Sequence, residues 1–131
     1  MLCITTSCHS SAPASIGTAA FKVALLKPGP ASDAAWNAAA FQGPQEIRQN
    51  LNVEPALAQT QAPADFEDSL RDFASRGFNI VFAHEFEYTD AALRVGKLFP
   101  KTWFIVTSGT GSAANVSSLT FKIEEATTSR V

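Results

Sequence analysis

Residues 21–37, with the sequence FKVALLKPGPASDAAWN, decide how this chain folds. The run from Val23 to Leu26 is apolar at every position, which is typical of a strand buried on both faces of a parallel sheet. A Pro-Gly-Pro turn at residues 28–30 ends the strand, and Ser32 or Asp33 can cap a helix that follows. This order predicts an α/β domain with a ligand site at the carboxyl end of the strand, where a helix N-terminus offers free N–H groups.

Three polar or aromatic residues at the start of that helix are candidate ligand contacts. Trp36 and Asn37 follow Asp33 at helical spacings of three and four residues, so all three share one face of the first turn. A carboxylate, a ring for stacking and an amide suit a polar ring-bearing molecule such as a nucleoside or a sugar. In the structural alternative, Asp33 only caps the helix, Trp36 belongs to the core, and Asn37 bonds exposed backbone.

Size and charge limit the function classes. A chain of 131 residues is one domain at most, and 46% of its residues are apolar. Ten basic residues are scattered among twelve acidic ones, for a net charge of −2, so no basic stripe is available to bind a nucleic acid backbone. No window approaches the roughly 20 apolar residues that cross a bilayer.

Residues 1–20 differ from the rest because they are small, polar and aperiodic, and we predict that they form a disordered or non-native leader. They lack the basic and apolar regions of a secretory signal. Cys3, Cys8 and His9 are too few for a four-ligand metal site, and no cofactor is expected. Lipid attachment at Cys8 is the alternative for this segment.

The remaining sequence alternates between strand and helix patterns, which predicts a three-layer α/β sandwich with a mainly parallel sheet. Apolar residues at helical spacing, followed by Gly77, mark residues 64–77 as the clearest helix. Pro44 should kink or split the first helix. Helices are predicted over residues 32–50, 64–77 and 90–99, and strands over residues 23–26, 53–58, 78–83, 103–107 and 116–121.

Two loops deserve comparison with enzyme motifs. His84 stands among carboxylates and could serve as a general base, but solvated charges and a helix cap at Thr89 or Asp90 are the favoured interpretation. The glycine-rich residues 108–112 open no helix with a lysine, so we expect a flexible connection rather than a phosphate-binding loop. No nucleophile stands at a recognisable elbow, and we predict no catalytic residues.

Three segments together resemble the N-terminal part of the basic membrane protein family, the purine nucleoside receptor-like substrate-binding proteins of ABC transporters. They are KVALLKPGPASDAAWNAAAFQG at residues 22–43, ADFEDSLRDFASRGFNIVFAHEFEYTDAALRVGKLFPKTWFIVTSG at residues 64–109, and NVSSLTFKIEEA at residues 115–126. The resemblance implies the first lobe of a type I periplasmic-binding-protein fold, in which two lobes close over a nucleoside for delivery to a membrane permease. With this resemblance, ligand contact becomes the favoured interpretation for Asp33, which would bond a ribose or base donor, and for Trp36, which would stack on the ring. Asn37 stays open between the base edge and exposed backbone, and the resemblance implies that Phe86 faces the cleft.

Some features depart from the family pattern. The family favours a small residue where this chain has Glu85, and members carry a lipoprotein signal and a second lobe. Residues 127–131 look unrelated to the helix expected there, so a truncated or frame-shifted lobe over residues 21–126 is predicted. Family members belong to the cell envelope, whereas the location of this chain is left open. An uncovered sheet face should favour self-association.

Two other hypotheses remain open at this point. One is a small flavodoxin-like enzyme or signalling domain that uses the loop from His84 to Asp90, and the other is an inactive remnant. Loss of activity on removal of His84 would indicate the enzyme, whereas ligand retention through Asp33 and Trp36 would indicate the binding protein.

Overall fold

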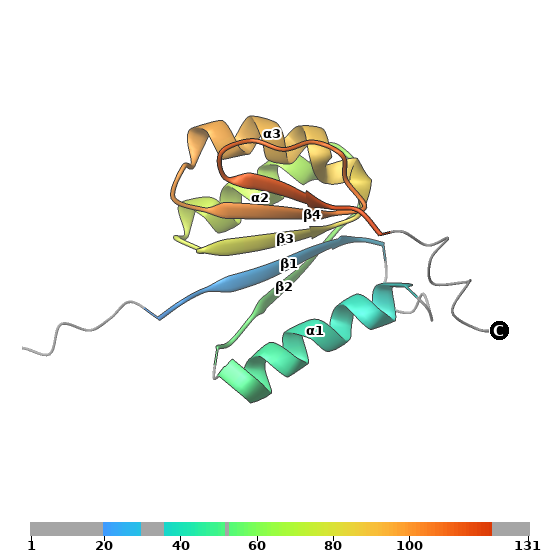
Figure 1. Ribbon diagram of the computed structural model, residues 1–131, viewed down its shortest axis with the longest axis vertical. Helices are drawn as coiled ribbons and strands as arrows, with labels where there is room; N and C mark the ends of the chain where they lie inside the picture. The colour runs from blue at the N-terminus through green and yellow to red at the C-terminus, as the bar shows by residue number, and fades with distance from the viewer. Residues whose placement is uncertain (1–19, 30–35, 52, 122–131) are drawn as a thin grey trace, which may run out of the picture.

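The computed structural model describes residues 20–29, 36–51 and 53–121. The strands of this part form one five-stranded sheet in the order β2-β1-β3-β4-β5, and all neighbouring pairs are parallel (Figure 1). In chain order the elements are β1 (Val23–Pro28), α1 (Trp36–Leu51), β2 (Ala56–Thr60), α2 (Asp65–Ser75), β3 (Ile80–His84), the 3-10 turn η1 (Phe86–Tyr88), α3 (Thr89–Leu98), β4 (Trp103–Thr107) and β5 (Val116–Leu119).

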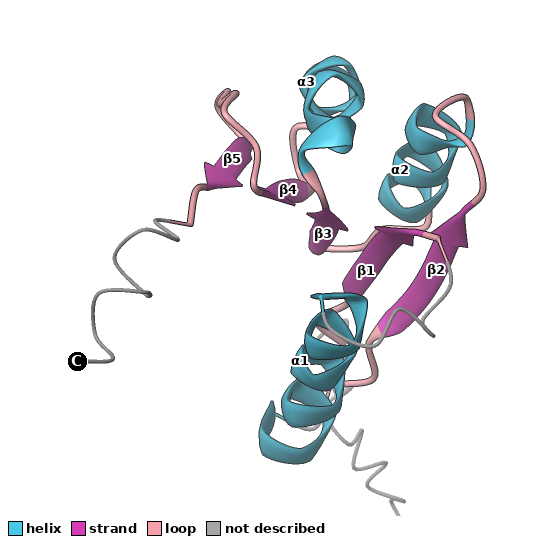
Figure 2. Cartoon of the chain, turned by 90° about the vertical axis from the view of Figure 1, so that its right-hand side faces the viewer, coloured by secondary structure: helices cyan, strands magenta, loops and turns pink. Residues whose placement is uncertain are grey.

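The sheet lies between two helical layers, which confirms the predicted three-layer α/β sandwich. Helices α2 and α3 cover one face, and α1 lies on the other face below β1 and β2 (Figure 2). Side chains that alternate along each strand form the core toward α2 and α3, because successive strand residues point to opposite faces. These core side chains include Ala24 and Leu26 of β1, Val81 and Ala83 of β3, and Phe104 and Val106 of β4.

Helix α2 folds as its sequence predicts. The four apolar residues at helical spacing, Phe66, Leu70, Phe73 and Ala74, are all buried. Gly77 adopts φ +74°, and its N–H donates to the Ala74 carbonyl while the Phe78 N–H donates to the Phe73 carbonyl. These two bonds form a Schellman motif, which satisfies carbonyls at the helix end and requires the left-handed conformation that glycine adopts without cost.

Two sequence predictions that involve proline differ from the structure. Pro44 does not split the first helix, because α1 is continuous from Trp36 to Leu51 and the proline ring is buried within it. Burial against the sheet offsets the hydrogen bond that proline removes. The second strand begins at Ala56 rather than Val53, because Pro55 has no N–H to donate to the ladder with β1.

The connection from β4 to β5 was expected to be flexible, but it is closely packed at its two glycines and at its end, while Thr110 and residues 112–114 between them are exposed. A Cβ on Gly109 would lie 2.7 Å from Ser118 Oγ, and one on Gly111 would lie 2.9 Å from Leu93 Cδ1. Buried Asn115 fixes the end of this loop, since its Nδ2 lies within 3.1 Å of the carbonyl oxygens of Gly96, Phe99 and Thr102. The glycines are needed here because a side chain would clash, and the asparagine is needed because it bonds carbonyls at the end of α3. A sequence pattern does not show where those carbonyl groups point.

Candidate functional site

The carboxyl ends of three adjacent strands lie together at one edge of the sheet. β1 ends at Pro28, β3 at His84 and β4 at Thr107, and the strands run parallel in that order. Helix α1 begins at the same edge, beside the end of β1 (Figure 1). In open α/β sheets this is the edge at which ligands bind.

His84 and Thr107 occupy paired register positions at this edge. The Thr107 hydroxyl lies 3.1 Å from His84 Nδ1 and accepts a hydrogen bond from the Glu85 backbone N–H at 3.0 Å. The Nε2 atom of His84 lies 4.0 Å from a carboxylate oxygen of Glu85. Burial lowers the pKa of His84, a shift that the Glu85 carboxylate opposes and the nearby Lys27 charge reinforces. The imidazole is therefore held in its neutral form at neutral pH.

The backbone is strained at the ends of both strands. Glu85, directly after β3, has φ 117° and ψ 147°, a conformation that is essentially reserved for glycine. Ser108, directly after β4, has φ 59°. Strained residues persist where the surrounding structure over-determines them, and they cluster at ligand sites.

Tyr88 lies in this region but is fully buried rather than solvated. Its hydroxyl is 2.6 Å from the hydroxyl of Thr60, at the end of β2, and its ring centroid lies 4.2 Å from that of Phe66. Burial raises the pKa of Tyr88 to about 12. The hydroxyl pair joins the end of β2 to the turn after β3, so Tyr88 stabilises the edge, and its phenol keeps its proton at neutral pH.

The structure of the loop from His84 to Asp90 differs in part from the expected solvated charges and helix cap. Glu87 and Asp90 are exposed, as solvated charges should be, but His84 and Tyr88 are buried. No side chain caps α3, because η1 runs directly into it, and the Thr89 hydroxyl donates instead to the Phe86 carbonyl at 2.6 Å. Because η1 continues into α3, Tyr88 before the helix already has helical backbone angles. No residue with an extended backbone therefore precedes α3 to act as an N-cap.

The four predicted ligand residues differ in how much of each the structure describes. Phe86 projects from η1 beside the carboxyl edge and is 62% exposed. Trp36 and Asn37 form the start of α1 at the same edge, although the structure describes only their backbone. Asp33 lies outside the described residues. Ligand contact by these four residues stays a prediction.

Lys27, which the sequence patterns did not indicate as a site residue, is buried next to His84 near the end of β1. A lysine that directly follows an apolar strand is the signal that could have found it. The described residues contain no group of three or more His, Cys, Asp or Glu side chains that could hold a metal ion. Among the described helices, none has the length and apolar character needed to cross a membrane.

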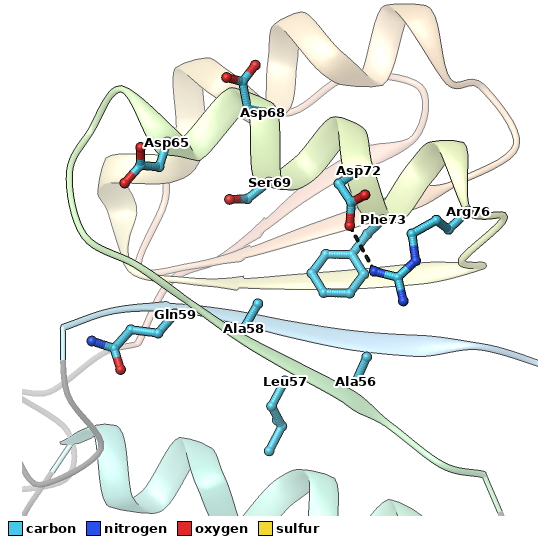
Figure 3. A pocket seen from close by; sticks show the side chains of 10 residues that line it. All are labelled: Ala56, Leu57, Ala58, Gln59, Asp65, Asp68, Ser69, Asp72, Phe73 and Arg76. Carbon is cyan, nitrogen blue, oxygen red and sulfur yellow. Dashed lines mark hydrogen bonds and ion pairs between the residues drawn. The ribbon is translucent and has the colours of Figure 1, made fainter.

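A separate groove of about 560 Å³ lies between α2 and the edge strand β2 (Figure 3). Two of its three acidic side chains, Asp72 and Asp65, have structural partners. Asp72 pairs with Arg76 at 2.8 Å, and Asp65 accepts the backbone N–H groups of Gln61 and Ala62 at 3.2 and 3.0 Å. The groove lies along the flank of the sheet, away from the strand ends, so we place the candidate ligand site at the carboxyl edge.

The chain is similar in sequence to two curated proteins. The chain is 30% identical over 107 residues to a purine-binding protein of Brucella abortus (strain 2308), covering 79% of the chain and 31% of that protein. It is 28% identical over 104 residues to the transcriptional activator protein Med of Bacillus subtilis (strain 168), covering 79% of the chain and 33% of that protein. The chain thus spans about a third of the length of these curated relatives.

A solved structure supports the same relationship. The solute-binding protein of an ABC transporter system from Conexibacter woesei DSM 14684 superimposes with a TM-score of 0.61 at 28% identity, over 76% of this chain and 34% of that one. Residues 20–127 match the sequence family described as PnrA-like ABC transporter substrate-binding proteins. Such proteins bind substrates rather than transform them, in agreement with the prediction of a non-enzyme. The chain belongs to the PnrA-like family of ABC transporter substrate-binding proteins.

Proposed function

We propose that this chain acts as a ligand-binding lobe of an ABC importer and holds a purine nucleoside, or a similar small molecule, at the carboxyl edge of its sheet. The strained backbone at Glu85, between the buried His84 and the exposed Phe86, carries the proposal. Strain of this kind costs about 1–3 kcal/mol and is retained where geometry serves a site. The similarity to a purine-binding protein supports the ligand class.

The proposed contacts combine stacking with polar recognition. Trp36 stacks on the base, Asp33 and Asn37 bond ribose or base groups, and Phe86 covers the ligand from η1. Aromatic stacking on a base contributes about 1–3 kcal/mol. One lobe contacts one side of a ligand, so we expect a dissociation constant no tighter than roughly the high micromolar range.

The two tryptophans of the sequence allow a matched test of this site. Trp36 begins α1 at the carboxyl edge, whereas Trp103 begins β4 at the opposite edge and is 51% exposed. Titration with guanosine, followed by calorimetry and tryptophan fluorescence, should show weak binding in wild type and in Trp103→Phe. Trp36→Ala should lower the affinity about tenfold, which corresponds to 1.4 kcal/mol. Nanomolar binding that survives Trp36→Ala would refute the proposed site.

Partners follow from the same proposal. An ABC permease would receive the ligand, and the site of action would be the cell envelope, as the family suggests. Self-association is also proposed, because no described helix lies over β4 and β5 on the side of α1 (Figure 2). Trp103 and Leu119 are 51% and 45% exposed. Light scattering should detect dimers or larger species, whereas a monodisperse monomer would exclude this interface.

A further inference from the structure

Lys27 is a buried cation at the candidate ligand edge that the proposed nucleoside contacts do not use. Its residue is only 8% exposed, although it stands at the end of β1, where the chain leaves the sheet. Lys27 is paired with Gln59 of β2. On the side of β3, the last pair is Leu26 with Ala83, so His84 lies beside Lys27 one position further along. The side chain therefore lies in the polar row that crosses the carboxyl edge.

The ammonium group of Lys27 has one bond in the part of the chain that the structure describes. Its Nζ donates to the Gly29 carbonyl oxygen at 2.8 Å. The ion pairs of the described residues involve Arg48, Arg71, Arg76, His84 and Arg94 and do not include this lysine. An ammonium has three donors, so the single carbonyl leaves two donors and the charge without a partner among the described residues.

A buried charge of this kind needs a counterion. The effective penalty for taking an ion out of water is several kcal/mol, and a neutral carbonyl returns only part of it. Glu85 also stands at this edge, but its carboxylate lies 4.0 Å from His84 Nε2. The Lys27 charge therefore favours an anion from outside the described residues.

The surroundings of Lys27 leave access for such a group. A pocket of about 190 Å³ opens beside the lysine, and Leu25, Leu57 and Gln59 also line it. Leu57 is 46% exposed, so the pocket opens to solvent along β2. A compact oxyanion fits a pocket of this size, and lysine binds phosphate as a point charge.

We propose that Lys27 binds an oxyanion, phosphate or carboxylate, that the ligand carries. This inference rests on the proposed ligand site and narrows its substrate class to anionic ligands, such as a nucleoside monophosphate in place of the neutral nucleoside. The base of such a ligand would still stack on Trp36, while its anionic end reaches the Lys27 ammonium beside Gly29.

Calorimetry on the full chain with guanosine and guanosine 5′-monophosphate tests the proposal. Wild type should bind the monophosphate at least tenfold more tightly than the nucleoside, a difference of about 1.4 kcal/mol. Lys27→Met should bring the ratio close to one. The matched control Lys97→Met removes an exposed lysine of α3 and should keep the wild-type ratio. Equal affinities for both compounds in wild type would overturn the anion proposal and leave the proposed function intact.

Thermal unfolding separates failure of this inference from failure of the proposed function. Inorganic phosphate and acetate, compared with chloride at equal ionic strength, should raise the melting temperature of wild type but not of Lys27→Met, and the stronger of the two identifies the preferred oxyanion. If neither guanosine compound binds, the proposed function fails, and this anion effect still decides the role of Lys27. Absence of any anion effect would overturn the inference.

The stability of the variants without added anion provides a second test of the role of Lys27. Lys27→Met should be at least as stable as wild type, because it removes a buried charge that has no counterion among the described residues. A marked loss of stability in Lys27→Met, matched by an equal loss in Asp33→Asn, would identify an ion pair within the chain. That result would overturn the inference, since the counterion would then be Asp33 and not a ligand.

Discussion

Substitutions at Glu85 should reverse the usual stability order of alanine and glycine. Glu85 has φ 117° and ψ 147°, where any Cβ is unfavourable, and a strained conformation of this type costs about 1–3 kcal/mol. Glycine relieves that strain but costs about 0.5–1 kcal/mol in chain entropy relative to alanine. The difference predicts that Glu85→Gly is more stable than Glu85→Ala by up to about 2.5 kcal/mol. Both variants lose the carboxylate near His84, so the comparison isolates the backbone term.

Urea denaturation followed by circular dichroism measures this difference. Asp90 supplies the control, because it is exposed in the first turn of α3, where glycine has no such advantage. Asp90→Ala should be more stable than Asp90→Gly by up to about 1 kcal/mol, the ordinary helical order. If Glu85→Ala proves as stable as Glu85→Gly while the control behaves as stated, the backbone at Glu85 is not strained. The main structural support for the proposed ligand site would then be lost.

Two further variants test the packing of the edge and of the last crossover. Asn115→Ala should lower the free energy of unfolding by about 2–4 kcal/mol, because three carbonyl oxygens lose the amide that lies within 3.1 Å of them. A loss below about 1 kcal/mol in urea titrations would show that those carbonyls are satisfied without Asn115. His84 should make stability depend on pH, because burial holds its folded pKa below the ordinary 6.5 and the unfolded chain binds the extra proton. Stability should thus be constant above about pH 6.5 and fall as the pH drops from that value toward the folded pKa, whereas His84→Asn should lack this slope. The shifted pKa of Glu67 acts below its ordinary 4.5 and leaves this window clear, so parallel pH profiles between pH 5 and 8 would contradict the assignment to His84.

Local sequence patterns were sufficient for most of the secondary structure. The β4 prediction, residues 103–107, matches the structure at both ends, and α2 closes with the Schellman motif that Gly77 indicated. These features depend on hydrophobic periodicity and on the conformational freedom of glycine, which act over a few residues. The parallel sheet followed from the alternation of strands and helices, because parallel strands require crossover connections.

The same patterns could not give the chemistry of the carboxyl edge. Nothing local distinguishes a buried His84 or Tyr88 from solvated neighbours, since their burial depends on β4, β2 and α2 packing around them. The bonds of Asn115 to the end of α3 span up to 19 residues and exist only once α3 and β5 pack together.

The sequence by itself determined the α/β class, the family resemblance and the edge at which a ligand site should lie, because strand direction and helix order follow from the chain. The tertiary structure decided which side chains at that edge are buried, where the backbone is strained, and that Lys27 lies beside His84 across neighbouring strands. These properties depend on register and desolvation, which arise only when segments that are distant in the sequence pack against each other.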